Sequence, residues 1–454
     1  MMNRPIKKSS PGDWGVFGIV MSGVSRITLA LGLTLALMFT LGAPNPASAQ
    51  PVKMGVSLFL AGAAAGPFGV PARNGVELMI DSINKGSLPA PYNTKGLAGA
   101  SIVVKYIDEG GGATKQVIEF RNFAQRDKMN VVLGYISSGN CIAIAPVADE
   151  LKLLTMIPIC GTPRLFEDAS YKYVFRTISS SITDSVGAAH YIKSRFPNIK
   201  TMGAINPNYS WGQDSWRDFH LAMSEVKPGI KIVTEQFPKL FAGQFSSEIS
   251  VLLRKRPGVI HSALWGGDIE SFVYQLAARG LHKRSKIVLT TGEANMFRLG
   301  AKLPDGIIIG GRGPYGVLAG DTPLNTWFRK TYFNKFSAPP VYPSYMTAQS
   351  MLALKIAYDK ASKARGGGMP STEQVIAAME YLKFEAFGTT IDLAYGNGHQ
   401  AVTETAYGMS KWDRDNGTQT ITDVMRFKAE CVNAPKGMKG AAWIKGGMKG
   451  AKCN

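Results

Sequence analysis

The sequence lacks the residue patterns of the common metal and nucleophile sites. It has only five histidines among 454 residues, and none of them forms an H-E-x-x-H motif or a pair four residues apart. It contains no G-x-S-x-G elbow, and the glycine-rich stretch 62–66 lacks the Lys-Ser/Thr of a phosphate-binding loop. The stretch 311–316 matches G-x-G-x-x-G, but Pro314 and the polar turn beyond it do not open a helix at once, so it reads as a loop. We therefore expect no enzyme activity, no catalytic residue, no metal and no cofactor.

Cysteine is also scarce, with four in the chain. The cysteines lack C-x-x-C spacing, which argues against a metal site, and their even number fits disulfides formed in an oxidising compartment. We favour the pairs Cys141 with Cys160 and Cys431 with Cys453. Reduced, buried cysteines remain the alternative.

Acidic residues are few relative to basic ones. The chain has 32 aspartates and glutamates against 51 lysines and arginines, which gives a formal net charge of +19. The basic residues are dispersed and become concentrated only in the tail from Lys428 to Lys452. We therefore expect no nucleic-acid partner, and a basic surface that keeps the protein soluble or close to anionic lipid.

The N-terminus has the features of a secretory signal in their usual order. Basic residues up to Arg26 precede an uncharged apolar run over 27–41, and Ala47-Ser48-Ala49 follows. We expect cleavage after Ala49 and export to the periplasm as a soluble protein. An uncleaved membrane anchor is the competing interpretation, but the apolar run is short for a span.

Two successive blocks of the chain alternate strand-like apolar runs with helical patterns. The first block covers about 53–163, and the pattern restarts after an extended segment at 173–177 and continues to Glu293. This alternation predicts parallel sheets with helices on both faces, so the fold class is α/β with two doubly wound lobes. Two long helical patterns, 322–336 and 344–364, are too few for a third lobe, and we expect them to complete the first.

The last part of the chain changes in pattern. Residues 388–427 show hairpin-like alternation, and the Lys/Gly-rich tail after them is expected to be flexible unless its two cysteines hold it. The predicted limits are 1–49 for the signal peptide, 50–176 and 311–387 for the first lobe, 177–310 and 388–427 for the second lobe, and 428–454 for the basic tail.

The stretch from Val131 to Pro163 holds the best candidate for a binding site. Its serine turn 137–140 ends one strand and opens a helix, and Gly161-Thr162-Pro163 ends the next strand. If these strands are parallel neighbours, both loops emerge at the carboxyl edge of the sheet, where open α/β sheets hold ligands. The Ser138 hydroxyl and the free N–H groups of the helix would then face an anion. The alternative is that Ser138 only caps the helix.

Many short segments, in a consistent order, carry a resemblance to a known family. They are the strand and Gly-Pro-Phe-Gly loop over 52–69, Asn74 to Glu77, Gly134 to Asn140, Gly161 to Pro163, Tyr173 to Arg176, Asn206 to Gly212, Gln244 to Ile249 and Trp265 to Gly267. Together they resemble the type I periplasmic solute-binding proteins, in particular the branched-chain amino-acid (leucine/isoleucine/valine) binding branch that serves ABC importers. The likeness extends from about Val52 to Phe427.

This resemblance implies a Venus-flytrap fold with three hinge crossings between the lobes, which we place near 176–179, 310–313 and 387–391. It also implies a monomer that captures a small polar solute, an amino acid or a related carboxylate or amide, and delivers it to an ABC transporter permease. The permease would be its only link to the membrane. A ligand-sensing receptor module of the same fold, not coupled to transport, is the alternative function.

The resemblance also implies which residues bind the ligand's carboxylate. In such relatives the first lobe holds the α-carboxylate and α-amino groups of the ligand, and by position this role falls to Ser138, Gly161 and Thr162. Gly161 departs from the more usual small side chain, which leaves room for an amide or an aromatic carboxylate in place of an amino acid.

Aromatic and acidic residues complete the set implied by the resemblance. Phe68 and Trp211 stand where relatives commonly place tyrosines over the ligand, and Glu293, or else Asp268, is the acid expected to meet an amino group. The alternative for the two aromatic residues is a place in the core. For the two acids it is a place in the first turn of a helix.

Overall fold

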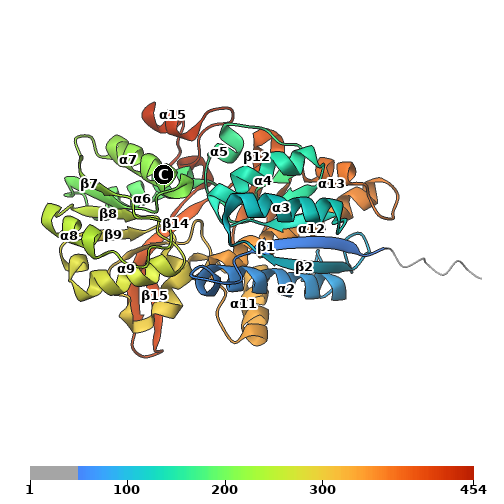
Figure 1. Cartoon of the computed structure of the whole chain (residues 1–454), viewed down its shortest axis with the longest axis horizontal. Helices are drawn as coiled ribbons and strands as arrows, with labels where there is room; N and C mark the ends of the chain where they lie inside the picture. The colour runs from blue at the N-terminus through green and yellow to red at the C-terminus, as the bar shows by residue number, and fades with distance from the viewer. Residues whose placement is uncertain (1–49, 454) are drawn as a thin grey trace, which may run out of the picture. The chain divides into compact units, whose positions relative to one another are not determined.

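The computed structural model describes residues 50–453, and the predicted signal peptide, residues 1–49, lies outside this range. The described strands form three sheets of five, seven and three strands (Figure 1). Among the described helices, none has both the length and the apolar character needed to span a bilayer.

The first sheet has five parallel strands in the order β2-β1-β3-β4-β5. Because β3 lies between β1 and β4, the loops that follow these three strands emerge side by side at one edge of the sheet. The strands are β1 (Val52–Leu58), β2 (Ile102–Asp108), β3 (Val131–Gly134), β4 (Leu154–Met156) and β5 (Val174–Phe175).

Helices cover both faces of this sheet, and we call the assembly the first lobe. Side chains alternate along β3, so Val131 and Leu133 join the core under α2 and α12, whereas Val132 packs with α3 and α4. Burial on both faces explains why these strands read as continuous apolar runs in the sequence. The helices are α2 (Val70–Lys85), α3 (Gly112–Gln125), α4 (Ser138–Glu150) and α12 (Tyr342–Ala364).

The second sheet has seven strands in the order β15-β14-β10-β9-β8-β6-β7, and with its helices it forms the second lobe. Met202 and Ala204 of β6 face α6 and α7, and Ile205 faces α8 and α9. The strands β14 and β15 are antiparallel, so this sheet is mixed. The elements are α6 (Ser181–Arg195), β6 (Thr201–Ile205), α7 (Ser210–Val226), β7 (Lys231–Gln236), α8 (Ser246–Lys255), β8 (Val259–Ser262), α9 (Gly267–Ala278), β9 (Lys286–Leu289), β10 (Ile308–Gly310), β14 (Thr405–Asp413) and β15 (Thr418–Phe427).

After β10 the chain returns to the first lobe. Buried side chains of α11, α12 and α13 join the same core as β1 and α2, for example Phe328, Leu352 and Val375. The returning helices are α11 (Pro323–Phe336), α12 and α13 (Thr372–Met379). The short helical turns of the chain are η1 (Ala65–Gly69), α5 (Arg164–Glu167), η2 (Leu281–Lys283), η3 (Gly292–Asn295), α10 (Met296–Leu299), η4 (Gly300–Lys302), η5 (Gly316–Leu318) and η6 (Gly396–Gly398).

A small antiparallel sheet of β11 (Lys383–Glu385), β12 (Thr390–Tyr395) and β13 (Gln400–Val402) follows α13. Its buried residues, including Ile391 and Leu393, belong to the core of the first lobe. The predicted limits assigned 388–427 to the second lobe, with a crossing near 387–391. In the structure β12 and β13 pack with the first lobe instead. We therefore propose that the third crossing lies at 403–404, directly before β14.

The C-terminal tail packs on the second lobe. Trp443 of α15 (Gly440–Lys445) is 1% exposed and lies in the same core as Phe219 of α7. Cys431 of α14 (Ala429–Val432) forms a disulfide with Cys453. The sequence analysis expected a flexible tail unless its two cysteines hold it, and the structure shows that the disulfide does hold it.

Candidate functional site

A small cavity lies where the loops of the two lobes meet. Figure 1 shows the first sheet in blue to teal and strands β6 to β9 of the second sheet in green to yellow. The cavity is narrow, because aromatic side chains from both lobes fill most of the space. Its lining residues are Phe68, Ile136, Ser138, Ile159, Gly161, Tyr209, Trp211, Trp265, Thr291, Arg312 and Tyr342. Of the residues predicted to bind ligand, four are brought together here: Phe68, Ser138, Gly161 and Trp211.

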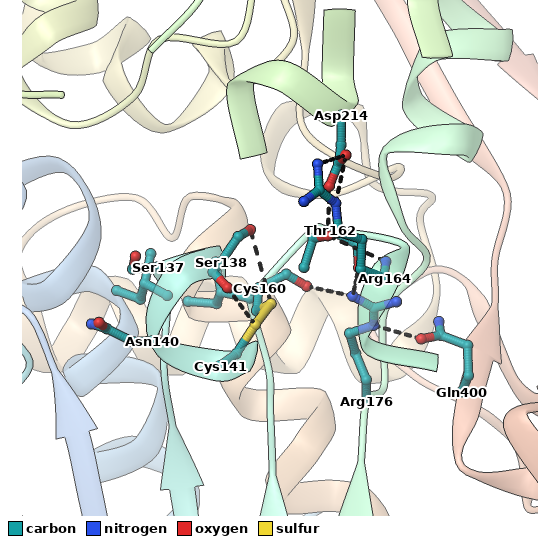
Figure 2. The surroundings of a disulfide bond; sticks show 12 residues. Ser137, Ser138, Asn140, Cys141, Cys160, Thr162, Arg164, Arg176, Asp214 and Gln400 are labelled. Carbon is teal, nitrogen blue, oxygen red and sulfur yellow. Dashed lines mark hydrogen bonds and ion pairs between the residues drawn. A yellow bond between two sulfur atoms is a disulfide. The ribbon is translucent and has the colours of Figure 1, made fainter. Parts of the chain in front are cut away.

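Ser138 is the first residue of α4 and does not cap it. The N-cap residue is Ser137, and its side chain makes no capping hydrogen bond. Ser138 is 1% exposed, and its hydroxyl lies 3.9 Å from Sγ of Cys160 (Figure 2). A helix N-terminus with unpaired N–H groups and a hydroxyl beside it favours negative charge. Capping therefore does not account for Ser138, and its position at the cavity does fit anion binding.

Glu109 holds the serine turn in place through hydrogen bonds, and the sequence analysis did not predict it as part of the site. Its carboxylate accepts hydrogen bonds from the backbone N–H groups of Ile136 (2.8 Å) and Ser137 (2.8 Å) and from the Asn140 side chain (3.1 Å). Burial raises the pKa of Glu109 to about 8, although these hydrogen bonds oppose the shift. The one signal in the sequence is an acid placed directly after a strand, at the edge where the serine turn emerges.

A disulfide joins the two predicted ligand loops. The structure pairs Cys141, on α4, with Cys160, at the end of the loop after β4 (Figure 2). This is the pairing that the sequence analysis favoured. The bond holds the serine turn and Gly161 next to each other, which limits their relative movement.

Arg312 is the second residue of the site that sequence reasoning missed, because it was placed in a hinge loop. Its Nε donates to Asp184 (3.2 Å), its Nη1 donates to the Ile159 carbonyl, and its guanidinium lies 4.4 Å from the centre of a Trp211 ring. Its backbone φ is +53°, a left-handed value that is uncommon outside glycine. Nη2 has no hydrogen-bond partner within the described part of the chain.

Gly161 makes room for these groups. A Cβ atom at this position would lie 2.4 Å from Nη2 of Arg312 and 2.4 Å from Cζ3 of Trp211. Any side chain at position 161 would therefore push the guanidinium or the indole away from the cavity. The departure of Gly161 from the usual small side chain thus has a physical reason.

A second buried arginine holds the same loop from behind. Arg176 donates to the carbonyls of Cys160 (3.0 Å) and Thr162 (2.6 Å) and to Gln400 (2.5 Å) (Figure 2). Burial lowers the pKa of Arg176 to about 9, and the neighbouring Arg312 adds to this effect. None of these three Arg176 contacts is to an acid, although the charge of Glu167 acts on Arg176 and opposes part of the shift.

Thr162 is not part of the cavity wall and instead connects the two lobes. Its hydroxyl donates to Asp214 of α7 (2.6 Å), and Arg164 donates to the same carboxylate through Nε (3.0 Å) and Nη2 (2.8 Å) (Figure 2). Asp214 is 1% exposed and also pairs with Arg217 of its own helix. The loop after β4 therefore carries both a cavity residue, Gly161, and a polar contact between the lobes.

Aromatic rings form most of the cavity wall. Phe68 packs edge-on against Trp265 (5.3 Å) and Tyr342 (5.4 Å), so rings from both lobes meet across the cavity. Trp211 lies in the first turn of α7, and its Nε1 donates to the Ala263 carbonyl (2.9 Å). Nε1 of Trp265 and the Tyr342 hydroxyl are buried without a partner in the described structure.

Neither acid predicted to meet an amino group lines the cavity. Asp268 accepts from the N–H groups of Phe241 (2.7 Å) and Gly243 (3.0 Å). Glu293 is fully buried behind the wall, where it accepts from the Tyr342 N–H (2.7 Å), and burial raises its pKa to about 8. Both carboxylates thus organise loops around the site rather than face into it.

One group of metal-type ligands occurs within the described chain, formed by His190, Cys431 and Cys453. Its two sulfurs are bonded to each other in the tail disulfide, so they do not fit a metal site.

Comparison with known proteins identifies relatives along most of the chain. A family model described as periplasmic binding protein matches residues 51–418. A Leu/Ile/Val-binding protein of Rhizobium johnstonii, BraC3, is 25% identical over 260 residues, which cover 53% of this chain and 66% of the relative. The chain thus matches just under two thirds of that relative's length.

Solved structures show the same fold at lower identity. A solute-binding protein of an ABC transporter from Rhodopseudomonas palustris BisB5, in complex with 3,4-dihydroxybenzoic acid, superposes with a TM-score of 0.72 at 20% identity, over 85% of this chain and 99% of that one. A leucine-binding protein from Thermotoga maritima superposes with a TM-score of 0.68 at 17% identity, over 82% and 98%. The two-lobed α/β fold predicted from the sequence is therefore confirmed.

Proposed function

Because the chain belongs to the periplasmic binding protein family, we propose that it captures a small carboxylate-bearing solute between its lobes and delivers it to the permease of an ABC importer. We further propose that residues 1–49 direct its export to the periplasm and that it works there as a monomer without catalysing a reaction. The observation that carries the proposal is the cavity between the lobes, which is lined by Ser138 at the uncapped N-terminus of α4 and by Arg312 with its unpartnered Nη2.

These groups suit a carboxylate. Leucine and dihydroxybenzoic acid, the ligands named for relatives, differ in every respect except that both carry this group. A carboxylate accepts charge-assisted hydrogen bonds from a guanidinium and from helix N–H groups, which are about twice as strong as neutral ones. An affinity in the micromolar range corresponds to about −8 kcal/mol, which a few such bonds and one stacked ring supply.

Binding is coupled to closure of the lobes. The first lobe contributes Phe68, Ser138 and Gly161 to the cavity, and the second contributes Trp211 and Trp265. A solute that contacts both sets stabilises the closed form by its differential contacts, and residues of the crossings absorb the rotation. Because the cavity is narrow, a ring-sized solute enters only when the lobes or the aromatic side chains move apart. The permease then recognises the closed form.

A thermal-shift panel followed by an uptake assay tests this function. Amino acids, amides and aromatic acids are each added to the mature protein, and we expect one class to raise the melting temperature, since a ligand that binds only the folded state stabilises it. The best solute is then supplied in labelled form to cells with and without the gene. We expect uptake to fall when the gene is deleted and to return with the wild-type gene. Normal uptake in the deletion strain would contradict the importer function and would favour a sensing receptor module.

A further inference from the structure

The side chain of Arg312 is built to offer one donor to the cavity. Two of its nitrogens are engaged, by Asp184 and the Ile159 carbonyl, and the guanidinium rests on Trp211. Of the three Arg312 nitrogens, Nη2 is the one that is buried without a partner among the described residues. Leaving a buried charged donor unpaired is costly, and because this donor belongs to a residue of the cavity wall, a ligand acceptor can satisfy it.

Both buried arginines donate to carbonyls of the loop 159–162, and each has an acid nearby. Arg312 pairs with Asp184, and the charge of Glu167 acts on Arg176. Neither acid is bonded to Nη2 of Arg312, which has no partner among the described residues. Nη2 is therefore a charged donor that a ligand carboxylate can meet.

The cavity wall has no acidic side chain that could pair with an ammonium group of a ligand. None of the residues that line it, all within the described chain, is acidic. Glu109 is bonded to the serine turn and Asp214 to Thr162 and Arg164. Glu293 lies behind the wall, where one oxygen accepts from the Tyr342 N–H and the other has no partner among the described residues. An ammonium group buried here would have no countercharge, which is strongly unfavourable.

The walls of the cavity favour a flat ring. Phe68, Tyr209, Trp211, Trp265 and Tyr342 surround the space beside Nη2. The guanidinium of Arg312 lies 4.4 Å from the centre of a Trp211 ring. A carboxylate that bonds this guanidinium places an attached aryl group next to the aromatic side chains of the wall, where ring contacts add to burial.

We propose, on the basis of the function proposed above, that the solute is an aromatic carboxylate without an ammonium group, and that Arg312 is the residue that selects it. Gly161 is the second determinant, because the absence of a side chain there leaves the space that Nη2 itself occupies.

Pairs of ligands that differ by one group test the selection by calorimetry. 3-Phenylpropionate and phenylalanine differ only in the ammonium group, and benzoate and benzamide differ only in the carboxylate. We expect each first member to bind the wild-type protein at least about 30-fold more tightly than the second, as an unpaired buried charge or donor predicts. Tighter binding of phenylalanine or of benzamide would overturn the proposal and leave the solute-binding function standing. Absence of binding by all four, together with no shift in the amino-acid panel, would overturn both.

The variant Arg312→Lys keeps the positive charge beside Asp184 but removes the forked donor. We expect it to weaken benzoate at least about tenfold while benzamide changes little. Circular dichroism and the melting temperature report whether the variant folds. If Arg312→Lys does not fold, Gly161→Ala provides the same test, since its Cβ displaces Nη2. An unchanged preference for benzoate over benzamide in a folded variant would remove Arg312 as the selecting residue.

A different observation concerns the C-terminal tail, which is anchored on the second lobe but also contacts the first. The N–H of Gly440 donates to Glu167 (2.8 Å), and Lys439 pairs with Asp168 (2.8 Å), both just after the loop that holds Gly161. Lys436 lies over the ring of Tyr381 of the first lobe (5.1 Å). The segment 436–440 thus spans the two lobes.

We infer that this segment is a strap that stabilises the closed form. The double variant Glu167→Ala/Asp168→Ala removes both acceptors on the first lobe and leaves the anchorage of Trp443 and the tail disulfide intact. We expect it to weaken the best solute of the panel about 3- to 10-fold, since a partly buried and an exposed contact are lost. The variant Lys445→Ala, which changes the tail away from this contact, is the control. Equal affinities in all three proteins would overturn the strap.

Discussion

The buried carboxylate of Asp214 accepts three hydrogen bonds from the first lobe, so the variant Asp214→Asn should shift the balance between open and closed forms. The wild-type carboxylate accepts hydrogen bonds from the Thr162 hydroxyl and from two nitrogens of Arg164, both in the first lobe. Its pairing with Arg217 stays within α7 and exists in both forms. The asparagine keeps the shape but presents an amide nitrogen, a donor, to groups that are themselves donors.

The magnitude follows from these contacts. Hydrogen bonds that involve a charged group contribute about 1.5–3 kcal/mol each. The Thr162 bond to Asp214 is buried, and the Arg164 side chain is 42% exposed, so its share is smaller because of solvent screening. The closed form should therefore lose about 2–4 kcal/mol, a factor of about 30 to several hundred in the ratio of closed to open. If the closed form is the minor one without solute, the dissociation constant rises by the same factor.

Two measurements check this result. Calorimetry with the solute that stabilises the protein most gives the affinity, and electron spin resonance gives the distance between labels at the exposed positions Ile118 on α3 and Ile232 on β7. The control is Asp305→Asn, because Asp305 contacts Lys411 and the Trp412 N–H within one lobe. We expect the control to leave the affinity unchanged. Asp214→Asn with wild-type affinity and an unchanged label distance would refute the coupling of this contact to closure.

Three further predictions concern the cavity itself. Ser138→Ala should weaken binding by about 1–3 kcal/mol through the lost hydroxyl contact, and unchanged affinity in calorimetry would remove Ser138 from the site. Gly161→Ala should weaken binding at least about tenfold because its Cβ collides with Nη2 of Arg312, whereas Gly139→Ala, whose Cβ meets nothing closer than 3.8 Å, should not; equal effects would contradict the role of Gly161. Burial raises the pKa of Glu109 from its ordinary value near 4.5 to about 8, so between these two pH values the folded protein holds a proton that the unfolded chain has lost. The free energy of unfolding should therefore fall as the pH rises from about 4.5 to 8, by at most about 1.4 kcal/mol per pH unit. Urea unfolding at pH 6 and pH 8 should show a smaller fall for Glu109→Gln, and identical falls would contradict the raised pKa.

Local patterns of the sequence predicted the fold class well. Continuous apolar runs indicated parallel strands buried on both faces, and the structure buries Val131, Val132 and Leu133 completely. The limits of the small sheet were harder to predict. Hairpin signals near 395–398 and 415–417 are alike in the sequence, but the first hairpin pairs with β11 and the second with β10. Which sheet a hairpin joins depends on contacts between distant segments, and local pattern does not encode them.

The candidate site could be predicted only for residues near strand ends. Ser138 and Gly161 follow β3 and β4 directly, so topology alone brings them together. Arg312 follows β10 of the other sheet and reaches the cavity only because the crossing aims its long side chain across the interface. Thr162 is next to Gly161, yet its hydroxyl turns to Asp214. The direction of one side chain depends on partners from the other lobe, which sequence spacing does not reveal.

The most direct test of the central claim is a crystal structure of the mature protein grown with benzoate. We predict a carboxylate within hydrogen-bond distance of Nη2 of Arg312 and the Ser138 hydroxyl, with the ring between Trp211 and Trp265. Benzoate bound elsewhere, for example in the groove between the C-terminal tail and β12, with no density beside Arg312, would contradict the account.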